Sequence, residues 1–511
     1  MSKNIIVIGS GFSGLSSACY LAKSGYSVTV IEKNNELGGR ARTWIKDGFT
    51  FDMGPSWYWM ADIFEEFFKD FDKQVSDYYE LIRLDPAYRV FHSDLNRTDL
   101  PAKIEDIKGL FQKLEKDGQG AQKLEKFLEF AEYTYQKGVG EYMRKPSNTI
   151  KEFIDLDFLS GVLKAKILNS YGKEIDKQFE NPVLREILKF PTLFLGSTPE
   201  QTPYLYSLMA YTQLIGGTHY PKGGMHKIVE AMVSLATELG VKFITNSVVT
   251  KIITKKDQKN DLVTSVEYTK KDLTNQTDQT DQIIIQECDY LISSADYEHT
   301  EQTLLDPEYR RYDDKYWDNR ELSPSSLLFY VGIKEKINGL EHHNLFFDTD
   351  FNLHAKEIYT DPRWPSDPLF YVCCPSKTDS SIAPIDCENI FILIPLAPNL
   401  KDTQELRNKY FKIVVERMQK KLGIDLTNQI IFKRDYCIQD FKDDYNSYKG
   451  NAYGLANTLR QTAIFKPKIR SKLSNMFYAG QLTVPGPGVP PSIISGKIAS
   501  QEIINLDKKT T

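Results

Sequence analysis

The sequence predicts an α/β protein with more than one folding unit, and three observations support this prediction. The chain has 511 residues, which exceeds the usual size of a single domain. Apolar residues make up 41% and charged residues 26%, as in an ordinary globular protein. A β-run over residues 4–8, a helical stretch over 12–24 and a second β-run over 26–31 follow one another. Both β-runs are apolar enough to be buried on two faces, which indicates a βαβ unit in a parallel sheet.

The region after this unit is predicted to be rich in helix. Residues 100–143 carry two apolar stripes at helical spacing, and helical signals continue over 154–189, where Pro182 suits a helix start. Core packing is the better interpretation of the stripes, and a lipid-binding face is the alternative. The stripes consist of Ile104, Ile107, Phe111, Leu114, Leu124, Phe127, Leu128 and Ala131.

The second half of the chain alternates between short β-runs and helices, without an internal repeat. The polar stretch 270–282 between two of the β-runs is interpreted as a solvated hairpin loop. Helices are predicted at 225–239 and 492–505, and strands at 241–244, 248–253, 263–268, 283–286, 390–394 and 476–479.

Charge and cysteine content exclude several classes of function. Lysine plus arginine number 64 and aspartate plus glutamate 69, so the net charge of −5 argues against nucleic acid as a partner. The six cysteines show no CxxC spacing, so neither disulfides nor a structural metal site is expected. The first β-run begins near Met1 and no apolar run reaches the length of a membrane span, which favours a cytosolic location.

The turn after the first β-run carries a dinucleotide-binding motif, Gly9-Ser10-Gly11-Phe12-Ser13-Gly14. Its position between a strand and a helix makes the pattern specific. The first glycine forms a tight turn, the second lets the backbone approach a pyrophosphate, and the third lets the helix pack on the strand. Glu32 closes the second strand, where a carboxylate accepts hydrogen bonds from ribose hydroxyls and repels a 2′-phosphate. A Rossmann-like site for NAD or FAD is therefore predicted, and NADP is disfavoured.

A second glycine pair favours FAD over NAD. Gly38 and Gly39 follow Glu32 within a few residues and precede Arg40, whose guanidinium offers several fixed donors to phosphate. Dehydrogenases that use NAD do not need such a second clamp. For Arg40 taken alone, an ordinary surface charge is the alternative.

Four segments of the chain resemble the phytoene desaturase family of carotenoid desaturases, which lies within the amine-oxidase-like flavoproteins. The segments are 9–43, 48–60 with the sequence GFTFDMGPSWYWM, 219–232 and 475–500, so the resemblance covers nearly the whole chain. The first segment alone is typical of many FAD-binding oxidases. The GPS segment and the glycine-proline segment near the end of the chain are more specific.

The resemblance implies a discontinuous, Rossmann-like FAD-binding domain formed by residues 1–95, 220–300 and 466–511. A mixed sheet-and-helix substrate domain would comprise 96–219 and 301–465. No cysteine or histidine follows Cys437, so FAD is expected to be bound non-covalently.

The resemblance also implies which residues bind FAD. The helix after the two prolines at 490 and 491 would direct its amino end at the flavin, whereas 481–483 departs from the family pattern and leaves the ribityl contacts open. The implied contacts with the pyrophosphate are Gly9, Ser10, Gly11, Ser13 and Gly14, that with the ribose is Glu32, and the second clamp is formed by Gly39 and Arg40. The implied contacts with the flavin ring are Gly54, Pro55 and Ser56, and that with adenine is Val249. The implied contacts with the flavin edge are Gly480, Val489 and Ser492.

The substrate that the resemblance implies is a long polyene, whose C–H bonds carry no acidic proton. Hydride transfer to flavin N5 is therefore the expected route, with alignment and charge stabilisation as the main contributions of the protein. Trp57, Tyr58 and Trp59 follow the GPS segment and are candidates for an aromatic wall along the polyene, with packing between domains as the alternative for each. No acid or base is assigned, and Asp296 is expected to act as a turn or cap acceptor.

A polyene substrate dissolves in the bilayer, so peripheral attachment to a membrane is expected. No second dinucleotide motif provides a site for NADPH, so quinone or oxygen is expected to reoxidise the flavin. The candidate docking surface lies within 104–195, where apolar residues stand among few charges, and consists of Phe158, Leu159, Val162, Leu163 and Ile167.

The leading hypothesis is FAD-dependent desaturation of phytoene toward lycopene. Desaturation of a later carotenoid, for instance a 1-hydroxy carotenoid at its 3,4 bond, is the nearest alternative, and the FDMGPSWYWM stretch favours phytoene. A flavin amine oxidase and a non-catalytic carrier of prenyl lipids are two further alternatives. Glu32, Gly39 and Arg40 argue against the carrier.

Overall fold

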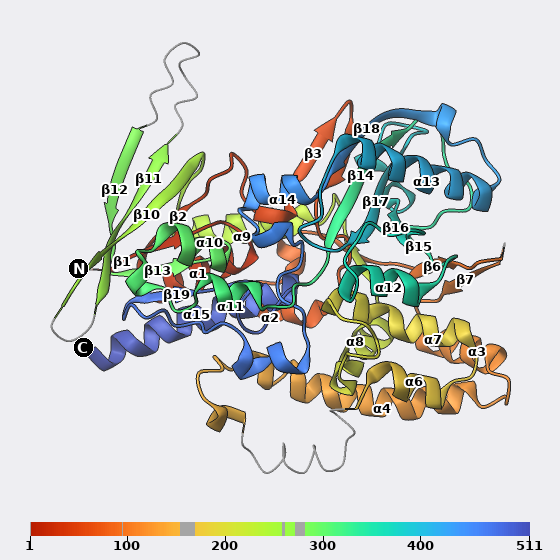
Figure 1. The fold of residues 1–511 in the computed structure, drawn as a ribbon, viewed down its shortest axis with the longest axis horizontal. Coiled ribbons are helices and arrows are strands. Elements are labelled where there is room, and N and C mark those ends of the chain that lie inside the picture. The colour runs from red at the N-terminus through yellow and green to blue at the C-terminus, as the bar shows by residue number, and fades with distance from the viewer. Residues whose placement is uncertain (1, 95, 154–168, 258–260, 271–281, 511) are drawn as a thin grey trace.

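A computed structural model of the protein describes residues 2–94, 96–153, 169–257, 261–270 and 282–510. The molecule is elongated, with two main β-sheets at opposite ends, as Figure 1 shows. A five-stranded sheet lies at the end that holds both chain termini, and a seven-stranded sheet lies at the other end above a group of helices. The predicted α/β class is confirmed.

The five-stranded sheet joins strands from the start, the middle and the end of the chain. Strand β1 (Asn4–Ile8) lies at its centre, between β2 (Ser27–Ile31) and β13 (Tyr290–Ser293). The outer strands are β9 (Lys242–Ile244) and β19 (Met476–Tyr478), and every neighbouring pair is parallel. With α1 (Phe12–Lys23) between β1 and β2, the predicted βαβ unit is confirmed.

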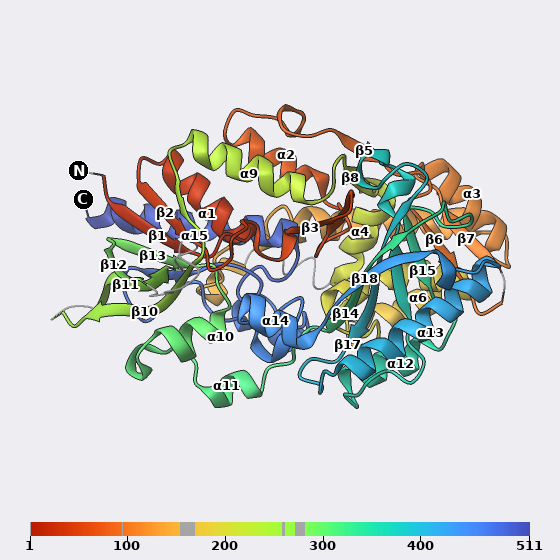
Figure 2. The ribbon, with the colours of Figure 1, turned by 90° about the horizontal axis from the view of Figure 1, so that it is seen from above.

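Helices α9 (His226–Glu238) and α15 (Val489–Thr510) pack against α1 beside this sheet, as Figure 2 shows. Leu15 of α1, Met232 of α9 and Ile498 of α15 belong to one apolar core. Helix α15 begins at Val489 rather than at the predicted Ser492. The two prolines at 490 and 491 therefore lie in its first turn, where a missing N–H costs no helical hydrogen bond.

A separate antiparallel sheet consists of β10 (Ser247–Lys255), β11 (Leu262–Lys270) and β12 (Gln282–Glu287). It confirms the three strands predicted in this region. The predicted hairpin loop between β11 and β12 lies mostly outside the described residues.

The seven-stranded sheet has apolar side chains on both faces. Along β14 (Ser325–Ile333), Phe329 and Val331 pack into one core with Val414 of α13 (Gln404–Leu422). The alternate residue Tyr330 packs into a second core, on the side of the helical group. The other strands of this sheet are β18 (Ile430–Tyr436), β17 (Glu388–Leu396), β16 (Phe370–Cys373), β15 (His343–Phe346), β6 (Tyr88–Phe91) and β7 (Arg97–Leu100).

Strand β6 belongs to the seven-stranded sheet, where it pairs with β15. It precedes residue 95, at which the first predicted cofactor segment ends. Residue separation between β6 and β15 is too large for any local pattern to reveal this pairing.

The helical group confirms core packing as the role of the predicted apolar stripes. Helix α7 begins at Pro182, as predicted. Asn181 caps it by accepting a hydrogen bond from the Val183 N–H at 2.9 Å. Six of the eight stripe residues are buried, namely Ile107, Phe111, Leu124, Phe127, Leu128 and Ala131. The helices are α3 (Ile104–Leu114), α4 (Gly120–Gly138), α6 (Tyr171–Gln178), α7 (Pro182–Lys189) and α8 (Leu208–Tyr211).

The five residues proposed as a docking surface, Phe158, Leu159, Val162, Leu163 and Ile167, lie outside the described residues. Within the described ranges, no helix combines the length and the apolar character that crossing a bilayer requires. The smaller elements of the fold are β3 (Thr43–Lys46), β4 (Phe49–Asp52), α2 (Ala61–Lys69), β5 (Leu81–Arg83), β8 (His219–Pro221), α10 (Tyr297–His299), α11 (Asp314–Asp318), α12 (Phe351–Tyr359) and α14 (Ile438–Tyr445).

The contact between α1 and α15 depends on Gly496. A Cβ at this position would lie 2.4 Å from the Ser13 carbonyl oxygen and 2.7 Å from Ser16 Cβ. We expect Gly496→Ala to push the helices apart and to lower the free energy of unfolding by about 1–3 kcal/mol, measured by chemical denaturation. Gly109→Ala in α3 is the matched control, because a Cβ there meets nothing within 4 Å, and it should stabilise the protein by about 0.5–1 kcal/mol. Equal effects of the two substitutions would contradict this close packing.

Candidate functional site

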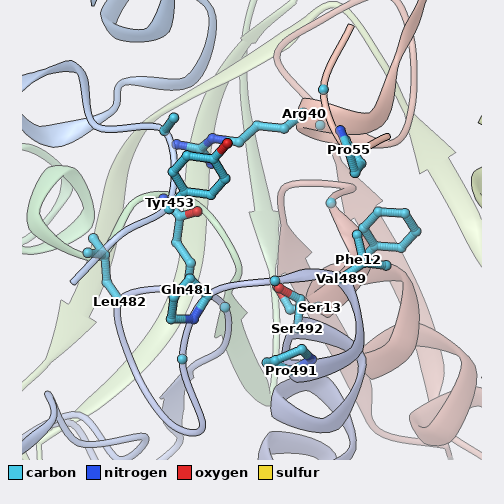
Figure 3. Close-up of a pocket in the computed structure, with 18 of the residues that line it drawn as sticks. Phe12, Ser13, Arg40, Pro55, Tyr453, Gln481, Leu482, Val489, Pro491 and Ser492 are labelled. Atoms are coloured by element: carbon cyan, nitrogen blue, oxygen red, sulfur yellow. The ribbon is translucent and has the colours of Figure 1, made fainter. Parts of the chain in front are cut away.

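A cavity of about 570 Å³ extends between the two parts of the molecule and is lined by residues from both. At one end its wall consists of residues 8–13, 38–41, 53–57 and the tail segment 478–492. Figure 3 shows Phe12 and Ser13 of α1 close to Val489 and Ser492 of α15, with Pro55 and Arg40 above them in the view. The segments that the sequence predicted to share one site are thus brought together.

The glycine turn has the geometry that its motif predicts. Gly9 has a φ of +91°, in the region that favours glycine, and a Cβ on Gly14 would lie 2.0 Å from the Gly9 carbonyl oxygen. Helix α1 can therefore pack on β1 only because residue 14 has no side chain, and Gly14 does not line the cavity. A Cβ on Gly11 would meet nothing within 4 Å, and Gly11 does line it. Space for a ligand is left open at the second glycine.

Two distant segments approach this turn closely. A Cβ on Gly39 would lie 3.2 Å from Gly11 Cα, and a Cβ on Gly480 would lie 3.2 Å from Ser13 Oγ. Gly480 also has a φ of +118°. The second glycine pair and the tail segment therefore both contact the first turn directly.

Glu32 lies at the end of β2 with 4% of its surface exposed. Its Oε2 accepts hydrogen bonds from the N–H and the hydroxyl of Ser10 at 2.9 and 2.7 Å. Its Oε1 accepts bonds from the backbone N–H and the side-chain amide of Asn34 at 3.0 and 3.2 Å. These donors fix the carboxylate in the cavity wall. A ribose hydroxyl that binds there must share or replace one of them.

Arg40 provides the test of whether the site suits an anionic group. Its guanidinium lies 4.9 Å from the centre of the Tyr445 ring, and its Nη2 donates to Ser447 Oγ at 3.2 Å. Its Nε is buried and has no hydrogen-bond partner among the described residues. Burial lowers the pKa of Arg40, and the nearby charge of Asp296 opposes this effect. A half-buried cation whose buried Nε is an unused donor, in a cavity wall, fits a phosphate group.

Asp296 acts as a cap, as the sequence predicted. Its Oδ1 accepts hydrogen bonds from the N–H groups of Glu298 and His299 at 3.1 and 3.3 Å, at the start of α10. Its Oδ2 accepts one from the Tyr448 N–H at 3.2 Å. Burial raises the pKa of Asp296 to about 6, against the effect of these donors and of Arg40. The carboxylate thus ties the start of α10 to the segment at Tyr448, next to the cavity.

The remaining predicted FAD contacts also line the cavity. They are Gly54, Pro55, Ser56, Val249, Val489 and Ser492. A Cβ on Gly54 would lie 2.0 Å from the Arg40 carbonyl oxygen, so the GPS segment is fixed against the second clamp. The first turn of α15 offers fewer donors than expected. Its prolines carry no N–H, and the Ser492 N–H donates to the Gly488 carbonyl at 3.0 Å.

The predicted aromatic wall is formed by two of its three residues. Trp57 and Trp59 line the cavity, and Trp57 stacks on His343 with ring centres 3.9 Å apart. Tyr58 is fully buried instead, stacks on Phe64 at 4.3 Å and does not line the cavity. Tyr58 therefore packs in the core, which was the alternative to a place in the substrate wall. Successive side chains of an extended segment point to opposite sides, so the middle residue faces the core.

Beyond the tryptophans the cavity wall is apolar. It is formed by the seven-stranded sheet, α12, α8 and the segments next to them, and includes Phe190, Leu193, Leu195, Leu205, Leu208, Met209, Leu328, Leu345, Phe347, Ile358, Leu369, Phe370, Phe391 and Leu393. The lysines, arginines and acidic residues in the lining are Glu32, Lys33, Arg40, Asp296 and Asp444 near the glycine turn, and Lys145. One end of the cavity suits a nucleotide and the other a hydrocarbon.

Two polar groups, one in this wall and one behind it, were not identified from the sequence. The Tyr359 hydroxyl, at the end of α12, is buried and has no hydrogen-bond partner in the described part of the chain. The Lys466 amine, behind the tail segment, is also buried and has no hydrogen-bond partner among the described residues. Neither residue lies in a motif, and no sequence signal marks a group as unpartnered before the fold is known.

One cluster of possible metal ligands lies beside Trp57. The ligand atoms of His342, His343 and Cys373 are within 4.8 Å of one another. His342 Nδ1 is paired with the Thr378 hydroxyl at 2.7 Å, and His343 Nδ1 with the Tyr371 hydroxyl at 2.6 Å. One nitrogen of each histidine ring is therefore already used in a hydrogen bond within the packed core.

Comparison with known proteins places this geometry in context. The chain matches the family model described as flavin containing amine oxidoreductase over residues 12–504. It is 37% identical over 504 residues to a carotenoid 3,4-desaturase of Haloarcula japonica, with 98% of each chain covered. It is 30% identical over 517 residues to a phytoene desaturase of Phycomyces blakesleeanus, with 98% of this chain and 85% of that protein covered. A solved oxidoreductase from Methanosarcina mazei has a similar fold, with a TM-score of 0.61 at 15% identity and coverage of 98% and 100%.

Removal of the Arg40 charge should weaken binding of FAD. A charge-assisted hydrogen bond to phosphate contributes about 1.5–3 kcal/mol, so we expect Arg40→Met to raise the dissociation constant of FAD about 10- to 100-fold. The measurement is a titration of FAD-free protein, followed by quenching of flavin fluorescence. Arg434→Met is the control, because Arg434 stacks over Trp44 at 5.1 Å and does not line the cavity. Equal affinity of the two variants would exclude Arg40 as a phosphate contact.

Proposed function

The chain belongs to the flavin-containing amine oxidoreductases and, among them, to the carotenoid desaturases, and we propose that it desaturates a carotenoid at its 3,4 bond. It is an FAD-dependent oxidoreductase, as the resemblance of its four motif segments predicted. The observation that carries the proposal is the cavity, whose nucleotide end continues directly into a long apolar wall.

We propose that FAD occupies the nucleotide end. Gly11 and Ser13 then receive the pyrophosphate, Glu32 the ribose and Arg40 a phosphate oxygen. The donors around Glu32 and the unused Nε of Arg40 support these roles. Pro55 and Ser56 lie between the glycine turn and Trp57 in the cavity wall, which supports their placement beside the flavin ring.

We further propose that FAD is bound non-covalently and is reoxidised by quinone or oxygen. The tail segment contains neither cysteine nor histidine, and no cysteine is among the described residues that line the cavity. Because a carotenoid partitions into the bilayer, the protein is proposed to work at a membrane surface.

Two observations favour a later carotenoid over phytoene. The chain is more similar to the carotenoid 3,4-desaturase than to the phytoene desaturase, at 37% and 30% identity. The buried Tyr359 hydroxyl gains a partner if the substrate carries a hydroxyl group, whereas a pure hydrocarbon leaves it unpaired. Phytoene, which the sequence alone favoured, remains the second candidate. The phytoene desaturase relative supports it.

A bound flavin supplies the acceptor for a hydride from the carotenoid C–H bond. The chain's own residues orient the polyene and exclude water. Trp57 and Trp59 present aromatic faces that tolerate partial positive charge on the neighbouring double bond. No carboxylate is among the described residues of the apolar wall, which also argues against an amine as the substrate. Alignment and desolvation are therefore the contributions expected of this wall.

The substrate is tested by expression in bacterial strains that accumulate different carotenoids. We expect a strain that makes a 1-hydroxy carotenoid to yield a product with one additional double bond, detected by a red-shifted absorption spectrum and a mass lower by two hydrogens. A strain that makes phytoene should retain it. Conversion of phytoene alone would reverse the order of the two candidates, and conversion of neither carotenoid by protein with bound FAD would contradict the proposal.

Tyr359→Phe should alter the choice between substrates. Loss of one hydrogen bond worth about 0.5–1.5 kcal/mol should lower conversion of the hydroxylated carotenoid about 2- to 10-fold relative to a non-hydroxylated one. Tyr206→Phe is a matched control in the same cavity, because the Tyr206 hydroxyl is already paired with Thr462 Oγ1 at 3.0 Å. The ratio of the two products, measured in paired extracts, should be unchanged in this control. An unchanged ratio in Tyr359→Phe would remove Tyr359 as a substrate contact.

A further inference from the structure

We propose that Lys466 holds a positive charge directly behind the Gly486 turn and so makes the bound flavin easier to reduce. The inference rests on the proposed function, since it requires FAD at the nucleotide end of the cavity. It assigns a role to a residue outside every motif that the sequence offered. Lys466 acts on the flavin through the electrostatic field of its charge, across one turn of backbone. It is therefore a positioning residue rather than a catalytic one.

The Lys466 amine is placed at the back of the cavity wall. The residue is 2% exposed, and its Nζ has no hydrogen-bond partner among the described residues. A Cβ added to Gly486 would lie 3.1 Å from this Nζ, and Gly486 itself lines the cavity with a φ of +135°. A single glycine therefore separates the amine from the ligand space. Any larger residue at position 486 would have to displace the amine.

Asn457 is the polar neighbour of this amine. Its Oδ1 would lie 3.3 Å from the same added Cβ, and this oxygen also has no hydrogen-bond partner in the described chain. Asn457 lines the cavity, so the pair forms a polar patch at the wall behind the turn. Buried polar atoms without partners destabilise a fold by about 1–3 kcal/mol each. Two such atoms at one place indicate that a ligand, rather than the fold, makes use of them.

Burial lowers the pKa of Lys466 to about 7, so its charge responds to what enters the cavity. No charged side chain contributes to this lowering. Lys468, on the same segment, directs its Nζ to the Ser147 and Ile464 carbonyl oxygens at 2.8 and 3.2 Å. Glu152 and Arg311 act on Lys468 rather than on Lys466. Negative charge in the cavity would therefore raise the pKa of Lys466 and draw a proton onto it.

Hydride transfer supplies such a charge. One proton and two electrons leave the carotenoid together, so the cofactor site gains one negative charge while the carotenoid loses its second hydrogen to water as a proton. Lys466 takes up a proton from water to match the new charge. The first turn of α15 can contribute less, because its two prolines lack N–H groups and the Ser492 N–H is already bonded.

The experiment measures the two-electron reduction potential of the bound flavin against reference dyes between pH 6 and pH 9. We expect Lys466→Met to disfavour reduction about tenfold at pH 6, which corresponds to about 30 mV for a two-electron couple. The difference from the unsubstituted protein should vanish toward pH 9, where the amine is neutral in both redox states. Lys466→Arg should restore the potential at pH 6 and keep it raised at pH 9, because arginine stays charged.

Lys472→Met is the matched control, since it removes an exposed lysine of the same segment and should leave the potential unchanged. A second measurement distinguishes a ligand-directed lysine from a structural one. The FAD-free Lys466→Met protein should unfold at a higher temperature than the unsubstituted protein, because an unpartnered buried amine has been removed. Equal potentials of Lys466→Met and the unsubstituted protein at pH 6 would overturn the inference. Failure of the unsubstituted protein to bind FAD would instead overturn the proposed function.

Discussion

The site depends on the close approach of four stretches of backbone that are far apart in the sequence. Gly54 lies against the Arg40 carbonyl and Gly496 of helix α15 against the Ser13 carbonyl, at distances that leave no space for a side chain. Gly39 lies tightly against Gly11, and Gly480 against the Ser13 hydroxyl. Because the contacts of Gly54 and Gly496 involve carbonyl oxygens of the main chain, a larger residue at either glycine would move a whole segment. The discontinuous construction of the nucleotide end is therefore a direct consequence of where glycine occurs.

A second constraint is the separation of charge along one cavity. Charged groups gather near the glycine turn, where Glu32 is held by donors from Ser10 and Asn34 and Arg40 keeps a donor unused. The sheet and helices that form the rest of the wall present hydrocarbon. Such a cavity cannot hold a hydrated substrate next to the cofactor, because water would be replaced by apolar surface on most sides. The same arrangement gives any remaining polar atom of the wall, such as the Tyr359 hydroxyl, a strong influence on which substrate fits.

The sequence predicted those parts of the structure that depend on local patterns. The βαβ unit, the glycine turn, the cap at Asp296 and the strands around β10 and β17 follow from hydrophobic period, glycine spacing and turn chemistry within a few residues. Pairing of β6 with β15 was missed because the partners are distant in the chain and nothing local distinguishes one apolar strand from another. The sequence offered both a wall role and a packing role for each of the three adjacent aromatics, and the fold shows that Tyr58 is the one that packs in the core. Lys466 could not be identified at all, since the lack of a partner is a property of the folded surroundings.

The segment from Gly54 to Trp59 connects the two ends of the cavity. Its first residues lie near the second glycine pair, and its tryptophans begin the apolar wall, so a single extended stretch borders both of the proposed ligand positions. Two contacts fix this stretch from outside the cavity. Tyr58 stacks on Phe64 in the core, and the Trp59 indole N–H donates to Thr218 Oγ1 at 2.9 Å. Because one stretch supports both ends of the cavity, a shift of this stretch would move Pro55 and Trp57 together. Core packing at Tyr58, which does not line the cavity, thus holds in place the residues that the proposed hydride transfer needs in alignment.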